Sequence, residues 1–168
     1  MMEDKKAIRK IRIWILFFIF ALLISGITAF PVLAEIKILN KYLGMGTAFA
    51  SIFPTLSAWF DTVYEGIVTT DKNAPFIFYG TDWLAYAHIS IAIGFIGPYR
   101  EPVRNKWFID FGIICCLLII PTALICGPIR GIPFWWRLID CSFGIFGLIP
   151  LLIVKQKINK LEIQIMNN

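Results

Sequence analysis

The sequence predicts an all-α membrane protein with four transmembrane helices and one interfacial amphipathic helix between the first and second spans. Hydrophobic residues make up 58% of the 168 residues and charged residues 16%, whereas a typical soluble domain has about 45–50% apolar and about 25% charged residues. Four apolar runs recur, each close to the roughly 20 residues that a helix needs to cross a bilayer. Lys and Arg gather beside alternate runs, as the positive-inside rule expects.

The four spans are predicted within one membrane domain that covers residues 1–168. They lie at about 13–33, 82–97, 107–127 and 137–154. The first run is longer than the core of a signal peptide, which holds about 7–15 residues, so we expect it to be retained. Pro31 should kink or end the first span, and Pro98 should end the second. Pro121 should kink the third, which membrane helices tolerate.

An amphipathic helix is predicted at about 47–68. Its large apolar residues recur at spacings of three and four, which places them on one face. They are Phe49, Ile52, Phe53, Leu56, Trp59, Phe60, Val63, Tyr64 and Ile67. The charged residues Asp61 and Glu65 fall on the other face. Such a helix either lies flat on the membrane or packs over the outer mouth of the bundle. Residues 69–80 are expected to form a loop, with a turn signal at Pro75.

The orientation follows from the Lys and Arg residues. Of these 16 residues, 11 lie in the head, in the segment between the second and third spans, and in the tail, and 5 lie in the two other segments. This excess predicts that both termini are cytoplasmic in a multi-pass protein of a bacterial inner membrane. It also explains the net charge of +5 without a nucleic-acid partner.

Six polar side chains are predicted to converge near the outer leaflet. They are His88, Asp140, Arg137, Asp82, Tyr86 and Arg130. His88, the single histidine, lies about 9 Å beyond Asp82 along its helix, and Asp140 lies about 7.5 Å beyond Trp135. The two groups therefore reach a similar depth. Since an ionisable group in a membrane helix is costly unless it faces protein or water, we expect a polar pocket.

Two interpretations of this cluster remain open. In the functional one, His88 and Asp140 orient a substrate or move a proton, while Arg130 and Arg137 hold an anionic head group. In the structural one, Arg137 and Asp140 pair along their helix and His88 bonds a backbone carbonyl. Both satisfy the rule that buried charges need partners.

Several chemistries lack support in the sequence. A single histidine does not provide two histidine haem ligands, and no CxxC pattern, Walker loop, GxGxxG or GxSxG is present. We therefore expect neither a cofactor nor a metal, and catalytic residues are unknown. Asp110, in the first turn of the third span, is expected to complement the helix dipole and to meet Arg100 or Arg104. Small-residue steps at Gly94–Gly97 and Gly144–Gly147 should let helices approach closely.

Two segments carry a resemblance to known proteins. They read DWLAYAHISIAIGFIGPYREPVRN and GPIRGIPFWWRLIDCSFGIFGLIP. The region from Asp82 to Pro150 resembles a family of small four-helix bacterial integral membrane proteins without assigned function. The resemblance covers about the C-terminal half of the chain. It implies an integral membrane protein and no particular activity.

Three functions fit the sequence. The first is a non-enzymatic protein that binds a lipid or small amphiphile, or serves as an accessory subunit. The second is a membrane-embedded enzyme acting on a lipid or isoprenoid-like substrate, with His88 as acid and base. The third is a small proton-coupled carrier, although the repeated halves typical of carriers are not evident. The partners expected are membrane lipids, a small amphiphile, and a second copy or another membrane protein.

Overall fold

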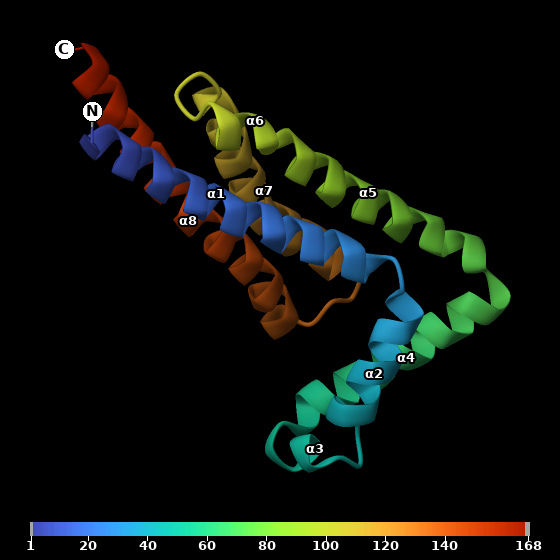
Figure 1. The fold of residues 1–168 in the computed structure, drawn as a ribbon. Coiled ribbons are helices and arrows are strands. Elements are labelled where there is room, and N and C mark those ends of the chain that lie inside the picture. The colour runs from blue at the N-terminus through green and yellow to red at the C-terminus, as the bar shows by residue number, and fades with distance from the viewer. Residues whose placement is uncertain (1, 167–168) are drawn as a thin grey trace. The chain divides into compact units, whose positions relative to one another are not determined.

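A computed structural model describes residues 2–166, with side chains for residues 5–164 and 166. Every regular element in this part of the chain is a helix, which confirms the all-α prediction. The elements are α1 (Met2–Ala29), α2 (Val32–Leu43), α3 (Ala48–Ile52), α4 (Pro54–Asn73), the 3₁₀ helix η1 (Pro75–Phe78), α5 (Tyr79–Gly94), α6 (Ile96–Arg100), α7 (Lys106–Ile129) and α8 (Phe134–Met166) (Figure 1).

Three helical segments in the described part are long and apolar enough to cross a membrane. They are Lys5–Ala29, Lys106–Ile129 and Phe134–Gln164. They correspond to the first, third and fourth predicted spans. This length and composition fit an integral membrane protein.

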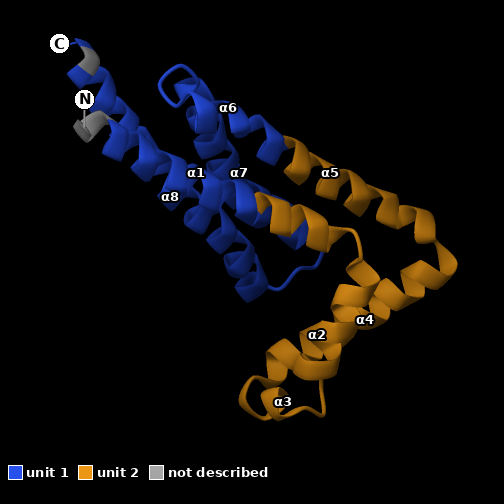
Figure 2. Cartoon of the chain, in the orientation of Figure 1, with its two compact units in different colours: residues 1–21, 91–168 blue, residues 22–90 orange. Residues whose placement is uncertain are grey.

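The chain divides into two compact units (Figure 2). Unit 1 comprises residues 1–21 and 91–168, and unit 2 comprises residues 22–90. Helices α1 and α5 each contribute residues to both units.

Unit 1 is built on close packing of α7 against α8. A β-carbon at Gly144 would lie 2.6 Å from the carbonyl oxygen of Cys116, and one at Gly147 would lie 2.9 Å from the Cys116 sulfur. The small-residue step on α8 therefore brings the two helices into backbone contact, as predicted. The side chain of Phe95 is fully buried, and its ring centre lies 4.7 Å from that of Phe18 on α1.

Unit 2 contains α2, α3 and α4, and here the single helix predicted at 47–68 is wrong. The helix is interrupted at Phe53, and Pro54 begins a second one. Proline disfavours helical dihedrals in the preceding residue but is well suited to the first helical position. Helix α4 then continues to Asn73 and η1 follows, so the loop predicted at 69–80 is also wrong.

The segment at the second predicted span is helical beyond its expected end. Backbone N–H groups of Phe95 and Tyr99 donate to the carbonyls of Ile91 and Phe95, at 3.1 and 3.0 Å, which links α5 to α6. The helix therefore passes Pro98 and ends at Arg100, and the prediction that Pro98 ends it is wrong.

Candidate functional site

An open niche lies at the N-terminal end of α5, within unit 2. Its volume is about 460 Å³, and it is lined by Phe30, Tyr79, Asp82, Trp83 and Tyr86. On α5, Asp82 and Trp83 are adjacent, and each is three or four residues from both Tyr79 and Tyr86, which places the four residues on one face. Phe30 comes from the turn between α1 and α2. The niche thus brings together two of the predicted site residues, Asp82 and Tyr86.

The aromatic rings of the niche stand edge to face. The ring centres of Tyr79 and Trp83 are 5.9 Å apart at 82°, and those of Trp83 and Tyr86 are 5.5 Å apart at 83°. This is a favoured geometry for aromatic pairs. Trp83 is 55% exposed and Tyr86 58%, so much of their ring surface is free to contact a ligand.

The carboxylate of Asp82 is the charged group of the niche. It is half-buried, and it has no ion pair or hydrogen bond among the residues whose side chains are described. Aromatic rings attract cations through the negative charge of their faces, and a carboxylate adds a full negative charge. The combination of four aromatic residues and one carboxylate is suited to an organic cation that carries an apolar part.

His88 lies on α5 nine residues, or about two and a half turns, beyond Tyr79. Its Nδ1 is 3.0 Å from the carbonyl oxygen of Leu84 on the same helix. Its β-carbon faces Gly26 of α1, where an added β-carbon would lie 3.2 Å away. His88 thus has the backbone partner that the structural interpretation requires. The same added β-carbon would lie 3.0 Å from the carbonyl oxygen of Ala85, so the two helices approach closely at Gly26.

Arg137 and Asp140 lie on α8, in unit 1. The aliphatic part of Arg137 packs against Gly127, and its guanidinium carbon lies 5.1 Å from the centre of the Phe134 ring. No ion pair joins Arg137 to Asp140 among the described side chains. The local pairing expected by the structural interpretation is therefore not formed. Arg130 follows α7 and is exposed.

The six predicted residues are divided between the two units. Asp82, Tyr86 and His88 belong to unit 2, and Arg130, Arg137 and Asp140 belong to unit 1. The pairing of His88 with Asp140 stays a prediction. Phe30, Tyr79 and Trp83 were not predicted as site residues. For Tyr79 and Trp83 the available signal was their spacing around Asp82, whereas no spacing in the sequence points to Phe30.

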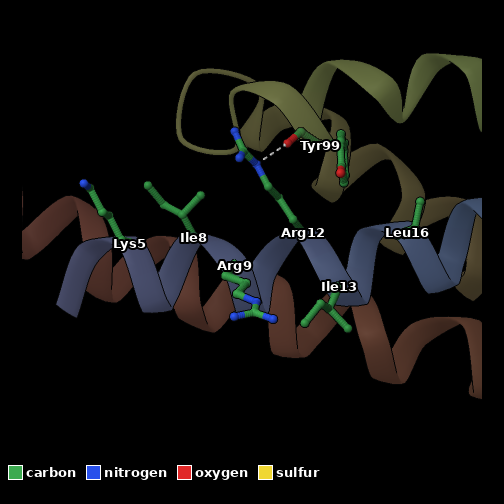
Figure 3. A pocket seen from close by; sticks show the side chains of 7 residues that line it. All are labelled: Lys5, Ile8, Arg9, Arg12, Ile13, Leu16 and Tyr99. Carbon is green, nitrogen blue, oxygen red and sulfur yellow. Dashed lines mark hydrogen bonds between the residues drawn. The ribbon is translucent and has the colours of Figure 1, made fainter. Parts of the chain in front are cut away.

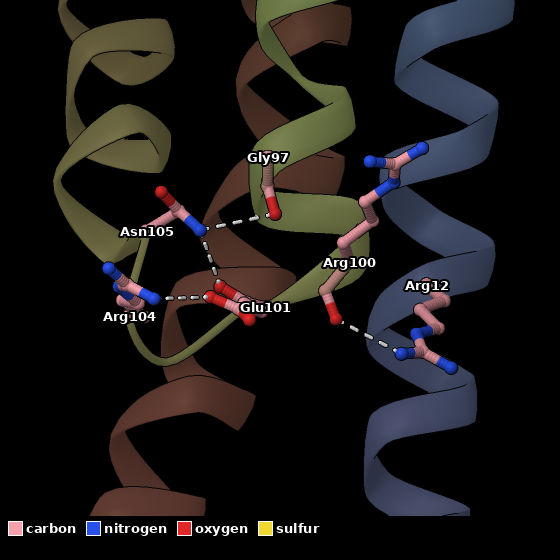
Figure 4. A network of polar contacts seen from close by, with 6 residues as sticks. All are labelled: Arg12, Gly97, Arg100, Glu101, Arg104 and Asn105. Atoms are coloured by element: carbon pink, nitrogen blue, oxygen red, sulfur yellow. Dashed lines mark hydrogen bonds and ion pairs between the residues drawn. The ribbon is translucent and has the colours of Figure 1, made fainter.

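A second polar region, in unit 1, joins the start of α1 to the end of α6. The Nε of Arg12 donates to the carbonyl of Tyr99 (Figure 3), and its Nη2 donates to the carbonyl of Arg100 (Figure 4), both at 3.0 Å. These carbonyls lack helical partners because the helix ends there. Asn105 donates to the carbonyls of Gly97 and Glu101, at 3.2 and 3.0 Å.

Ion pairs hold the neighbouring ends of α7 and α8 together. Lys106 pairs with Glu162 at 2.6 Å, and Asp110 pairs with Lys155 at 2.7 Å. The ion-pair partner of Asp110 is therefore a lysine of α8, and not Arg100 or Arg104 as predicted. Among the described residues, no group of three or more His, Cys, Asp or Glu residues is placed to hold a metal ion.

No protein-family model matches the chain, and neither the curated proteins nor the solved structures contain a significant match.

Proposed function

We propose that the chain is a four-span protein of a bacterial inner membrane, with both termini cytoplasmic, that binds a small amphiphile without transforming it. The head of this amphiphile would occupy the niche at Asp82, on the outer side. The observation that carries the proposal is the grouping of Tyr79, Trp83 and Tyr86 around an unpaired carboxylate. A volume of about 460 Å³ falls within the range of about 300–1,000 Å³ that is usual for ligand sites.

The continuity of α5 and α6 supports the fourth span. Together they run from Tyr79 to Arg100, which is about 33 Å of helix at 1.5 Å per residue. A hydrocarbon core is about 30 Å thick. The residues between Asp82 and Arg100 carry no Lys, Arg, Asp or Glu, so these two residues would stand at opposite membrane surfaces.

Contacts within unit 1 support the prediction that the three basic segments, which are the head, the α6–α7 linker and the tail, lie on the same side of the membrane. Arg12, near the start of α1, bonds the carbonyls at the end of α6. Lys106, at the start of α7, pairs with Glu162 near the end of α8. The head, the α6–α7 linker and the tail therefore meet at one end of the unit, as the positive-inside rule requires of cytoplasmic segments.

The position of the niche favours an amphiphile over a soluble ion. Asp82 borders the charge-free part of α5, so a head group bound there would lie at the membrane–water interface. The exposed side chain of Ile93, which lies further along the same face of α5, would contact the apolar tail. A quaternary or protonated amine suits the rings and the carboxylate best.

The test is binding of hexyltrimethylammonium to the full chain in nanodiscs made of phosphatidylethanolamine and phosphatidylglycerol, which contain no choline to compete. Hexyl sulfate serves as the anionic probe of equal tail length. Asp82→Asn and Trp83→Leu should each weaken binding of the cation by about tenfold, since a cation–π contact or a charge at a desolvated site contributes about 1–2 kcal/mol. Isothermal titration calorimetry gives the affinity.

Asp71→Asn is the matched control, because Asp71 is an exposed carboxylate of α4 outside the niche. It should leave the affinity unchanged. Equal binding of the sulfate and the ammonium probes, or equal loss in the Asp71 variant, would contradict the proposal. His88→Gln distinguishes the niche from the wider predicted pocket. The variant should bind the cation with unchanged affinity if the ligand occupies only the niche, and more weakly if the site extends to His88.

A further inference from the structure

A cleft between the start of α1 and the end of α8 is lined by lysines. Its volume is about 320 Å³. Its lining residues are Lys6, Ala7, Lys10, Lys157, Lys160, Leu161 and Gln164. The two helix ends lie side by side (Figure 1), so segments from opposite ends of the sequence contribute two lysines each. No carboxylate is among these lining residues.

The cleft lysines lie beside buried apolar residues and repel one another. Ile11 on α1 and Ile158 on α8, each next in sequence to a cleft lysine, are fully buried, and Leu161 is 2% exposed. Lys6 and Lys10 are four residues apart, and like charges at this spacing destabilise a helix. Such a group of cations is stabilised when an anion lies among them.

The carboxylates near this end whose side chains are described, Glu101, Asp110 and Glu162, pair with cations outside the cleft. The described ion pairs are Arg104–Glu101 at 3.3 Å, Lys106–Glu162 at 2.6 Å and Lys155–Asp110 at 2.7 Å. Within the described side chains, none of the four cleft lysines has an ion pair or a hydrogen bond. A counter-ion for them is therefore to be sought outside this part of the protein.

Two neighbouring clefts are less suited to an anion. The first lies between α1 and Tyr99 of α6 (Figure 3). Its Arg12 donates to the carbonyl of Tyr99, and its Arg9 points to the other side of α1 from Lys5 and Arg12. The second is lined in part by Glu101, whose carboxylate pairs with Arg104. The cleft between α1 and α8 differs from the first in drawing its cations from two helices and from the second in having no lining carboxylate.

The lysines also stand at the level of lipid head groups. Lys10 lies three residues before the charge-free run that begins at Ile13, and Lys157 lies three residues after Val154. Each distance is about 4.5 Å along the helix axis. Basic pockets between membrane helices are known to bind phosphate-bearing lipid head groups.

We propose that the cleft formed by Lys6, Lys10, Lys157 and Lys160 binds the head group of an anionic phospholipid, and that it favours a head with two phosphates over a head with one. Four cations from two helices are enough for each of two singly charged phosphodiesters to be approached by one lysine of α1 and one lysine of α8. The proposal requires α1 and α8 to be membrane spans, and it is independent of the niche at Asp82.

The test uses native mass spectrometry of the delipidated full chain in a non-ionic detergent. The probes are diphosphatidylglycerol, phosphatidylglycerol, phosphatidylethanolamine and inorganic pyrophosphate. The variant Lys10→Gln/Lys157→Gln removes one cation from each helix. Because each Lys near an anionic surface contributes about fivefold, it should bind diphosphatidylglycerol about 25-fold more weakly than the unaltered chain.

The control Lys37→Gln/Lys72→Gln makes the same change in net charge within unit 2 and should alter the affinity by less than twofold. If the first variant loses thermal stability, Lys6→Gln/Lys160→Gln takes its place, because both side chains are exposed. Equal losses in cleft and control variants would overturn the proposal, as would equal affinity for phosphatidylethanolamine. Pyrophosphate binding as tight as that of diphosphatidylglycerol would assign the cleft to a soluble phosphate compound and overturn the lipid assignment.

Discussion

Replacing Gly144 with alanine tests whether close approach of α7 and α8 holds unit 1 together. A β-carbon at this position would lie 2.6 Å from the carbonyl oxygen of Cys116 and 3.3 Å from the β-carbon of Ile119. Ordinary contact begins near 3.4 Å, so the carbonyl would have to move by about 0.8 Å. Because this obstacle is backbone, a rotamer change does not relieve it, and the two helices must separate.

The magnitude follows from two opposing effects. Inserting a methyl group into a closely packed interface costs about 1–3 kcal/mol. Alanine gains up to about 1 kcal/mol over glycine in helix propensity. Separation of the helices also loosens the contact between Gly147 and the Cys116 sulfur. We therefore expect Gly144→Ala to lower the free energy of unfolding by about 1–2 kcal/mol.

The assay is titration of the protein in bicelles with sodium dodecyl sulfate, followed by far-ultraviolet circular dichroism. Gly66→Ala is the control, since Gly66 also lies in a helix but no atom lies within 4 Å of its added β-carbon. It should leave the stability unchanged or raise it by up to about 1 kcal/mol. A Gly144→Ala protein as stable as the Gly66→Ala protein would refute the reasoning.

Three further predictions concern topology and polar contacts. A reporter fused after Asn73 should be active outside the cytoplasm and one fused to the C-terminus inside it, and a cytoplasmic signal after Asn73 would exclude the four-span arrangement. Asp61→Ala removes the carboxylate that accepts the N–H of Met45 at 3.3 Å, so amide exchange at Met45 should accelerate and stability should fall by about 1 kcal/mol; unchanged exchange would argue against this contact. Exchanging Lys106 and Glu162 for one another should restore most of the stability lost in the single variants, with a coupling of up to about 1 kcal/mol, whereas purely additive losses would show that the pair contributes nothing.

The apolar runs predicted the long helices well because their signal is simple. A charge-free run is a property of composition, and proline positions placed the end of α1 just before Pro31. The errors lie at other prolines. Pro54 begins a helix rather than continuing one, whereas Pro98 is accommodated within helical hydrogen bonding. Each proline lies in the first turn of a helix, α4 or α6, where its missing N–H has no intrahelical partner to lose.

The candidate site was predictable only in part, because distant contacts are not encoded in spacing. Asp82 and Tyr86 share a helix face and were placed in one pocket. Phe30 was missed because it lines the niche from the turn after α1, and the path of a turn is not indicated by hydrophobic periodicity. Arg137 and Asp140 have the spacing of an ion pair but do not form one, since the Arg137 side chain packs along Gly127 instead.

The distribution of counter-charges separates structural polar groups from those available to ligands. At the end where Arg12 meets the end of α6, backbone carbonyls and carboxylates are matched by cations, which explains these groups without any ligand. Asp82 has no such partner in the described part of the chain and stands among exposed aromatic rings. The cleft lysines Lys6, Lys10, Lys157 and Lys160 carry the opposite charge and likewise form no ion pair with a described side chain. Since unmatched charges at a membrane surface attract ions of opposite sign, these two places are predicted to bind ligands of opposite charge, and a probe that binds one should not compete at the other.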